Sequence, residues 1–270
     1  MKRHPYGTLL SIFVAYATAW TVLEPVVSFL DLTQSLGSAR FAAFLAIAFA
    51  IGVGRMAAQR AATIKIPGTN ATVHVEEGDL VSFAGHRIVS ANEYFDCQLG
   101  RHVAKESIHG QIIDHEFGGS AELFERAVDV ALEGVAAEDA SRSSGRKKRY
   151  PIGTVAPVHH GPNIIFLVAL SHTDANTLKA TATSSDLWHV LRSVWEAVRV
   201  HSNGRPVAMA LMGTGNAGIG LPYTKALEFI LLSLLDESRR NTIPTEIRVM
   251  APASVIASMD LGTVEESWKV

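Results

Sequence analysis

Two long apolar runs open the chain, and a short polar bend separates them before the pattern changes near residue 65. The first run, residues 7–30, contains one acid and is long enough to cross about 30 Å of hydrocarbon at about 1.5 Å per residue. The second run, residues 41–54, continues in apolar character to about residue 58. The pattern predicts a two-helix transmembrane hairpin over residues 1–62, with spans at about 7–30 and 40–58.

A cleaved signal peptide is the alternative explanation, but the first run is too long for one and a second run follows at once. Basic residues flank the outer ends of the two runs, whereas the bend at 31–40 carries one acid and one base. We therefore expect a multi-pass protein of the inner (cytoplasmic) membrane. Both termini and the soluble domain would face the cytoplasm, and membrane lipid would be a partner.

Small residues recur at every fourth position of the second run, at Ala42, Ala46 and Ala50, and such spacing allows helices to approach closely. In the first run, Glu24 and Pro25 place a charge beside a kink. Simple snorkelling of Glu24 at the interface explains that acid equally well. The alanine spacing favours a homo-oligomer.

The rest of the chain, residues 63–270, alternates between strand-like and helix-like patterns. Alternating or continuously apolar segments predict strands, and apolar positions three and four residues apart predict helices. The predicted strands are 71–76, 86–91, 152–158, 163–171, 206–211 and 247–250, and the predicted helices are 121–135, 184–200 and 223–237. This order predicts one α/β domain.

One long polar segment, residues 138–149, interrupts the pattern and predicts an exposed loop. It ends in the basic cluster 146–149. Such a cluster can bind anionic lipid or phosphate, but more often it simply faces water.

Composition excludes several classes of function. A net charge of −2 and a pI near 6.6 give no basic field for a nucleic acid, so none is expected as a partner. The single cysteine, Cys97, and the absence of paired Cys/His spacing suit a reducing compartment and predict no metal. The histidines His159 and His160 are adjacent, but neighbouring side chains on a strand point to opposite faces, so this pair is not expected to bind a metal together.

A G-x-G-x-x-G string lies between a predicted buried strand and a predicted helix start, which is the setting of an anion-binding loop. Glycines let backbone amides approach a phosphate, and the positive end of the helix dipole faces the same point. The candidate ligand-binding residues of this loop are Gly213, Thr214, Gly215, Asn216, Ala217, Gly218 and Ile219. A tight turn without a ligand is the alternative. A dinucleotide dehydrogenase would carry the string in its first strand–helix unit, and here it comes late.

The positions of four elements resemble those of the macro domain, a three-layer α/β/α module that binds ADP-ribose. They are Gly78-Asp79-Leu80, Ser90-Ala91-Asn92, the segment 107–111 and the glycine string at 212–220. In that family the aspartate accepts a hydrogen bond from the adenine amino group and the last asparagine contacts the distal ribose. The segment 107–111 corresponds to the family's first glycine-rich loop, and 212–220 corresponds to the second, which binds the diphosphate. The resemblance implies that Asp79, Leu80, Asn92, Ser107, His109 and Gly110 join the glycine loop in one ligand site, with no other cofactor.

More narrowly, the segments HRIVSANEYFD, ESIHGQ and LMGTGNAGIG behind a predicted hairpin resemble membrane-anchored macro-domain proteins of Thoeris anti-phage systems. In that family a partner TIR-domain protein makes an ADP-ribose-derived signal, and the macro protein is its receptor and effector. The sequence has Ser-Ile-His-Gly where hydrolytic macro domains carry a glycine run, and Glu-Tyr-Phe-Asp follows Asn92. These departures favour a receptor and not an enzyme.

Two other functions remain open. One is a membrane-tethered ADP-ribosyl or nucleotide hydrolase, in which Asp79, Asn92 or His109 positions a water. The other is a structural tether whose nucleotide fold is empty.

Overall fold

A computed structural model describes residues 61–175, 177–215 and 219–269, together with residues 13–14, 16–17, 20–21, 42, 46–47 and 49–50, which are helical. The predicted hairpin therefore lies mostly outside the described residues. Within the part that is described, no helix combines the length and apolar character needed to span a membrane.

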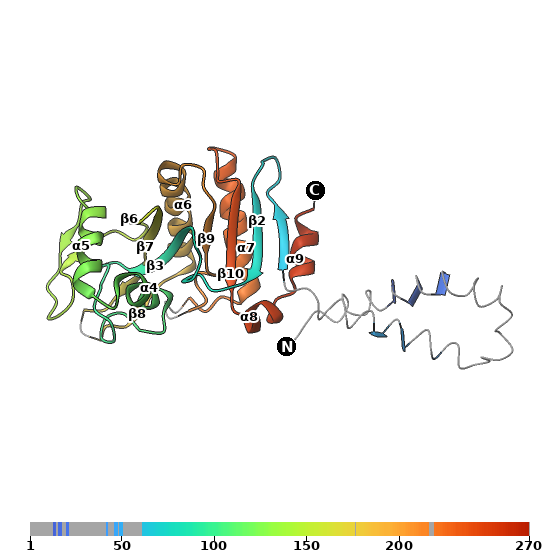
Figure 1. Ribbon diagram of the computed structural model, residues 1–270, viewed down its shortest axis with the longest axis horizontal. Coiled ribbons are helices and arrows are strands. Elements are labelled where there is room, and N and C mark those ends of the chain that lie inside the picture. The colour runs from blue at the N-terminus through green and yellow to red at the C-terminus, as the bar shows by residue number, and fades with distance from the viewer. Residues whose placement is uncertain are drawn as a thin grey trace.

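The domain is built on one mixed sheet with the strand order β1-β2-β10-β9-β3-β7-β6, and β8 pairs with β7 (Figure 1). Strands β2, β10, β9, β3 and β7 are parallel to one another, and β1, β6 and β8 are antiparallel to their neighbours. The strands are β1 (Ala61–Lys65), β2 (Thr72–Glu77), β3 (His86–Asn92), β6 (Val155–His160), β7 (Asn163–Thr173), β8 (Ala180–Thr181), β9 (Val207–Met209) and β10 (Glu246–Ala251).

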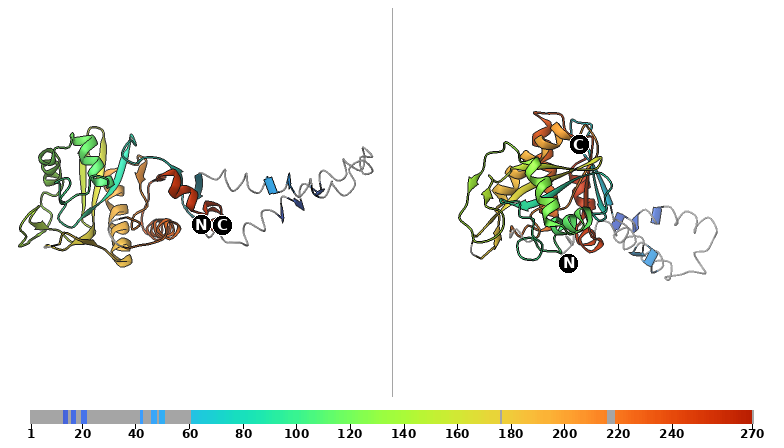
Figure 2. Two further views of the ribbon diagram at one scale, coloured as in Figure 1. Left: turned by 90° about the horizontal axis from the view of Figure 1, so that it is seen from below. Right: turned by 60° about the vertical axis from the view of Figure 1, so that its left-hand side comes forward.

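Helices cover both faces of this sheet, which gives the α/β domain three layers (Figure 2). One apolar core lies between the sheet and the helices α6 (Ser184–His201), α7 (Tyr223–Ser238), α8 (Ala253–Ser258) and α9 (Leu261–Ser267). The other lies under α4 (Ile108–Phe117) and α5 (Ala121–Ala131). Burial on both faces explains why β7 is apolar along almost its whole length.

Local sequence signals fix the ends of the longer helices. Thr183 and Asp186 form a capping box at the start of α6, and Ser120 caps α5. Helix α5 stops at Ala131, although the apolar pattern predicts a helix to residue 135. The predicted strand 152–158 begins three residues later, at Val155, because residues 152–153 form a turn.

The described domain begins with β1, which overlaps the last residues of the predicted hairpin segment 1–62. Sequence patterns also missed α4, α8 and α9, which are short or only weakly amphipathic. The predicted loop 138–149 contains a small hairpin formed by β4 (Glu138–Asp139) and β5 (Lys148–Arg149).

Candidate functional site: a cavity at the carboxyl ends of the parallel strands

A cavity of about 1030 Å³ opens where the parallel strands end. Its wall includes Gly78 and Asp79 after β2, Asn92 at the end of β3, Met212 and Gly213 after β9, and Pro252 after β10. Ligands of open α/β sheets bind at this edge, because loops and helix starts meet there. The volume is large enough for a dinucleotide-sized molecule.

Asp79 lies exposed at the rim of the cavity, in the turn that follows β2. Its Oδ1 accepts a hydrogen bond from the Val81 amide at 3.0 Å, and its Oδ2 accepts one from the Ser82 hydroxyl at 2.6 Å. The bond from Ser82 is the main reason that the pKa of Asp79 is lowered. Next to it, Leu80 is buried and packs into the core under α4. Asp79 is thus ionised and still offers acceptor capacity to a ligand.

Asn92 is the last residue of β3, begins the turn that follows the strand, and lines the cavity. Its Oδ1 accepts from the amides of Tyr94 (3.1 Å) and Asp96 (3.2 Å), and its Nδ2 donates to Asp96 Oδ2 at 3.0 Å. The side chain therefore holds the backbone of its own turn, and one Nδ2 hydrogen remains for a ligand.

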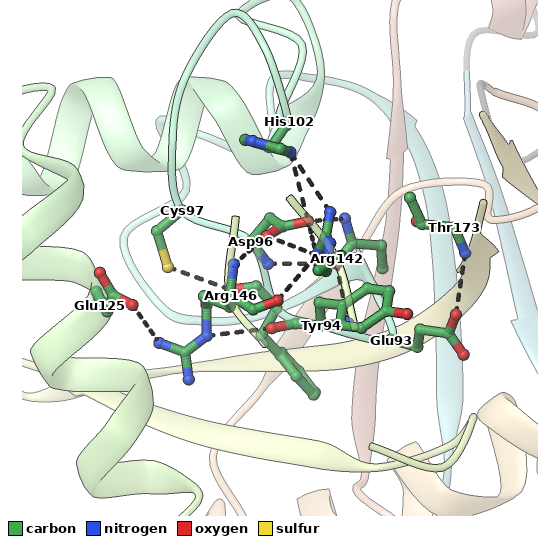
Figure 3. Close-up of polar contacts among 11 residues, drawn as sticks. Glu93, Tyr94, Asp96, Cys97, His102, Glu125, Arg142, Arg146 and Thr173 are labelled. Carbon is green, nitrogen blue, oxygen red and sulfur yellow. Dashed lines mark hydrogen bonds and ion pairs between the residues drawn. The ribbon is translucent and has the colours of Figure 1, made fainter. Parts of the chain in front are cut away.

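A buried polar cluster around Asp96 supports this turn (Figure 3). The Asp96 carboxylate accepts from Arg142 Nη1 at 3.0 and 3.1 Å and from the Arg146 amide at 2.9 Å. Arg142 also lies over the Tyr94 ring, with Cζ 4.0 Å from the ring centroid. We call Asp96, Arg142, Arg146 and Asn92 the Asp96 cluster. It joins the β4–β5 hairpin to the cavity wall.

The Asp96 cluster changes the interpretation of the basic segment 146–149. Arg146 is mostly buried and bonds to Glu125 (3.1 Å), Asp129 (2.6 Å) and the Tyr94 carbonyl (3.1 Å). Arg149 pairs with Glu138 on the facing strand. The longer segment 138–149 is predicted to be an exposed loop, but two of its arginines, Arg142 and Arg146, form internal ion pairs.

The start of α4 forms the next part of the wall. Ser107 caps the helix by accepting from the Gly110 amide at 3.0 Å, and its hydroxyl donates to the Ala104 carbonyl at 2.6 Å. Gly110 lies against the preceding loop, because an added Cβ would be 2.2 Å from the Ala104 oxygen. It therefore supports the wall from behind and does not line the cavity.

His109 lies deeper in the same wall and is buried against Phe124, with 5.5 Å between the ring centroids. Burial lowers the pKa of His109 to about 4. Its Nε2 has no hydrogen-bond partner in the described part of the chain, and the same is true of Nε2 of His102, another residue of the wall. Both rings are held neutral, since burial also lowers the pKa of His102.

Residues 211–215, the described first part of the glycine loop, form the opposite side of the cavity. Gly213 has φ +83°, which favours glycine, and the Thr214 hydroxyl donates to the Leu211 carbonyl at 2.8 Å. A Cβ at Gly215 would meet no atom of the described residues within 4 Å. Helix α7 then starts after its N-cap residue, Pro222, and among the described residues no side-chain cap bonds to its first turn. Glycines and an uncapped helix start together suit an anion.

The structure brings most of the predicted ligand residues to this one cavity. Those that line it are Asp79, Leu80, Asn92, Ser107, His109, Gly213, Thr214 and Gly215. Gly110 and Ile219 do not line it; Ile219 packs against the core beside α6. Asn216, Ala217 and Gly218 lie outside the described residues. Contact between these residues and a ligand stays a prediction.

Sequence reasoning missed other parts of the wall. These are the loop 100–104, Leu178 and Ala180 beside β8, Tyr223 of α7, and the segment 250–253 with Val255. The segment 250–253 could have been predicted, because it lies at the end of the predicted strand 247–250 and the carboxyl ends of parallel strands lie at one edge of the sheet. Among the described residues, no group of His, Cys, Asp and Glu is placed to hold a metal ion.

Comparisons with known proteins agree with this architecture. The chain resembles a variant of the Oceanobacillus iheyensis macrodomain with ADPR, at 16% identity and a TM-score of 0.51, covering 77% of this chain and 97% of that one. It also resembles the same macrodomain with ADP, at 13% identity and a TM-score of 0.50, covering 77% and 95%. No curated protein matches the chain significantly.

The mixed sheet, its two helical layers and the cavity between two loops define a macro domain, as the resemblance implied. Residues 73–252, about two-thirds of the chain, match the family described as "Thoeris protein ThsA, Macro domain". The chain belongs to this family, and the narrower resemblance to Thoeris macro domains is confirmed at that level.

Proposed function

We propose that this protein is the membrane-anchored receptor and effector of a Thoeris anti-phage system. Its macro domain binds an ADP-ribose-derived nucleotide made by a partner TIR-domain protein. Binding then changes the oligomeric state of the anchored protein or disrupts the membrane. The observation that supports this proposal most directly is the cavity of about 1030 Å³ between the glycine loop and the start of α4 in a ThsA-type macro domain.

The cavity is suited to both ends of such a nucleotide. The uncapped start of α7 and the open space at Gly215 favour a diphosphate. Asp79, with its lowered pKa, stays ionised near neutral pH and can accept a hydrogen bond from an adenine amino group. The likeness to macrodomain structures containing ADPR and ADP supports the same class of ligand.

The chemistry of the wall favours a receptor over a hydrolase. A general base works best when its pKa lies near the working pH. Burial lowers the pKa of His109 to about 4, and bonds within their own turns engage both Asp79 and Asn92. None of the three candidates is a free base with a pKa near neutrality. The hydrolase remains the second candidate, and the same experiment separates the two.

The experiment incubates the detergent-solubilised full chain with ADP-ribose and its conjugates, and measures ligand recovery and particle size. A receptor leaves the ligand intact and forms larger particles, because a ligand shifts assembly only by binding one state better. Cleaved ligand with unchanged particle size would establish the hydrolase instead.

A Gly215→Glu variant tests the location of the site. The new carboxylate should repel a diphosphate, and the fold should survive because the position has open space around it. We expect no binding by calorimetry and an unchanged unfolding transition. Normal binding by this variant would remove the glycine loop from the site.

A further inference from the structure

The register of β1 shows where the chain enters the domain. Strand β1 is antiparallel to β2, and its first residue, Ala61, pairs with Glu76 near the end of β2. The cavity rim begins at Glu77, the last residue of β2, and continues with Gly78 and Asp79. Residues before Ala61 therefore join the domain at the end of the sheet where the cavity opens.

The other end of the sheet lies farther from this junction. The turns at Gly68 and Gly204 and the residue before β10, Thr245, all lie at the amino ends of the parallel strands. A strand of six residues, such as β2 or β10, has a length of about 20 Å at about 3.3 Å per residue. The two ends of the domain are thus separated by about two-thirds of the thickness of a bilayer core.

Only a short linker joins the predicted membrane span to this junction. The second span ends at about residue 58, so only a few peptide units precede Ala61. An extended chain covers at most about 3.5 Å per residue, so β1 begins within about 10 Å of the end of the span. A linker this short cannot let the domain turn its opposite end to the bilayer.

We propose that the macro domain sits with the cavity end of its sheet facing the membrane, so that the ligand binds beside the membrane segment. This inference rests on the proposed anchoring. Pro252, Ala253 and Val255 line the cavity, and α8, which begins at Ala253, packs on β2. Because β2 pairs with β1, only one strand separates this part of the ligand site from the strand that joins the membrane segment. Figure 1 shows α8 at the lower end of β10, near β1 and α9.

Two positions that flank β10 provide a matched pair of probes. Ser254 lies exposed on α8 at the cavity end, and Thr245 lies exposed just before β10 at the other end. The native Cys97 is buried and burial raises the pKa of its thiol to about 12, so it will not react with a thiol-directed dye. Ser254→Cys and Thr245→Cys therefore each create one reactive thiol in the full chain.

The test labels both variants, reconstitutes them in vesicles of phosphatidylcholine and phosphatidylglycerol, and adds a lipid that carries a quencher in its head group. The wild-type chain, treated identically, measures the background label on Cys97. We expect the dye at position 254 to be quenched at least twofold more strongly than the dye at position 245. Equal quenching, or stronger quenching at 245, would overturn the proposed orientation.

Flotation of the same vesicles tests the membrane anchoring separately from the orientation of the domain. If the protein floats with the vesicles and 245 is quenched more strongly, only the orientation is wrong and the anchored receptor stands. If the wild-type chain does not float with the vesicles, the anchoring fails and the orientation fails with it. Ligand binding in detergent, measured independently, decides whether the receptor role survives.

Discussion

The two sides of the cavity are built in opposite ways. The first wall consists of the Asn92 turn, the loop 100–107 and the start of α4, and the buried Asp96 cluster, a helix cap and a tightly packed glycine hold it together. The second wall is the glycine loop, where no described atom lies near a Cβ at Gly215 and, in the part of the chain that is described, α7 starts without a side-chain cap. The first wall is fixed by its own bonds, and the second is left open for a ligand.

This difference predicts that changes in the first wall alter stability and that changes in the second alter binding. The largest effect is expected for Asp96→Ala, which leaves Arg142 buried without its partner. Breaking a buried ion pair on one side costs about 3–5 kcal/mol, so the free energy of unfolding should fall by that amount. Chemical unfolding of the detergent-solubilised chain, followed by tryptophan fluorescence, measures it.

Asp129→Ala is the matched control, because Asp129 is an exposed partner of Arg146 in the same cluster. Exposed pairs contribute about 0–1 kcal/mol. Equal losses in the two variants would mean that the buried cluster does not stabilise the first wall.

Acid should weaken the first wall through His109. The pKa of this ring is about 4 in the folded chain because of its burial, and about 6.5 in an unfolded one. Between these values the unfolded chain binds the proton more readily, so stability is complete above about pH 6.5 and falls as the pH drops toward 4. The total loss is about 3 kcal/mol.

The measurement compares unfolding free energies at pH 7 and pH 4.5 for the wild type, His109→Gln and the exposed control His201→Gln. The first variant should lose much of the pH dependence and the second should keep it. An unchanged slope in His109→Gln would show that another group governs acid sensitivity.

A glycine-to-alanine substitution can be made in each of the two walls. Gly110→Ala brings a methyl group within 2.2 Å of the Ala104 oxygen, whereas Gly215→Ala meets nothing within 4 Å. Overpacking costs about 1–3 kcal/mol, so the first variant should unfold more readily. The second should change stability by less than about 0.5 kcal/mol. A reversed order of unfolding midpoints would contradict the assignment of rigid and open walls.

The smallest effect is expected at the rim. Asp79→Ala removes an ionised acceptor, but the position is exposed and its bonds to Val81 and Ser82 serve only its own turn. Affinity for ADP-ribose should fall by about 1 kcal/mol, or roughly fivefold, in calorimetry. Asp114→Ala, an exposed acid that does not line the cavity, should bind as the wild type does.

The fold was predictable where burial imposes a period on the sequence. The strands β2, β3, β7, β9 and β10 and the helices α5, α6 and α7 all have clear apolar patterns, and each was predicted near its observed bounds. Helix α4 was missed because glycine and polar residues interrupt its apolar face. Its cap, Ser107, was recognised only as a loop residue through the family resemblance.

The site was predictable in outline and not in its internal bonds. The glycine string identified one side of the cavity from local sequence, and the family resemblance added the segment 78–80. The pairing of Asp96 with Arg142 joins residues 46 positions apart, and no local pattern reports such a contact. For the same reason the sequence could not show that the Arg146 side chain is buried against Glu125 and Asp129.

The β4–β5 hairpin has a practical consequence for handling the protein. Surface hairpin loops usually tolerate insertions and sequence variation. Here Gly145 leaves no space, since an added Cβ would lie 2.5 Å from Asp96 Oδ1, and Arg142 and Arg146 of the hairpin loop both bond to Asp96. An epitope tag placed in the hairpin would therefore disturb the Asp96 cluster and, through Asn92, the wall of the cavity. The turn at Gly161, where a Cβ meets nothing within 4 Å, is the better place to graft one.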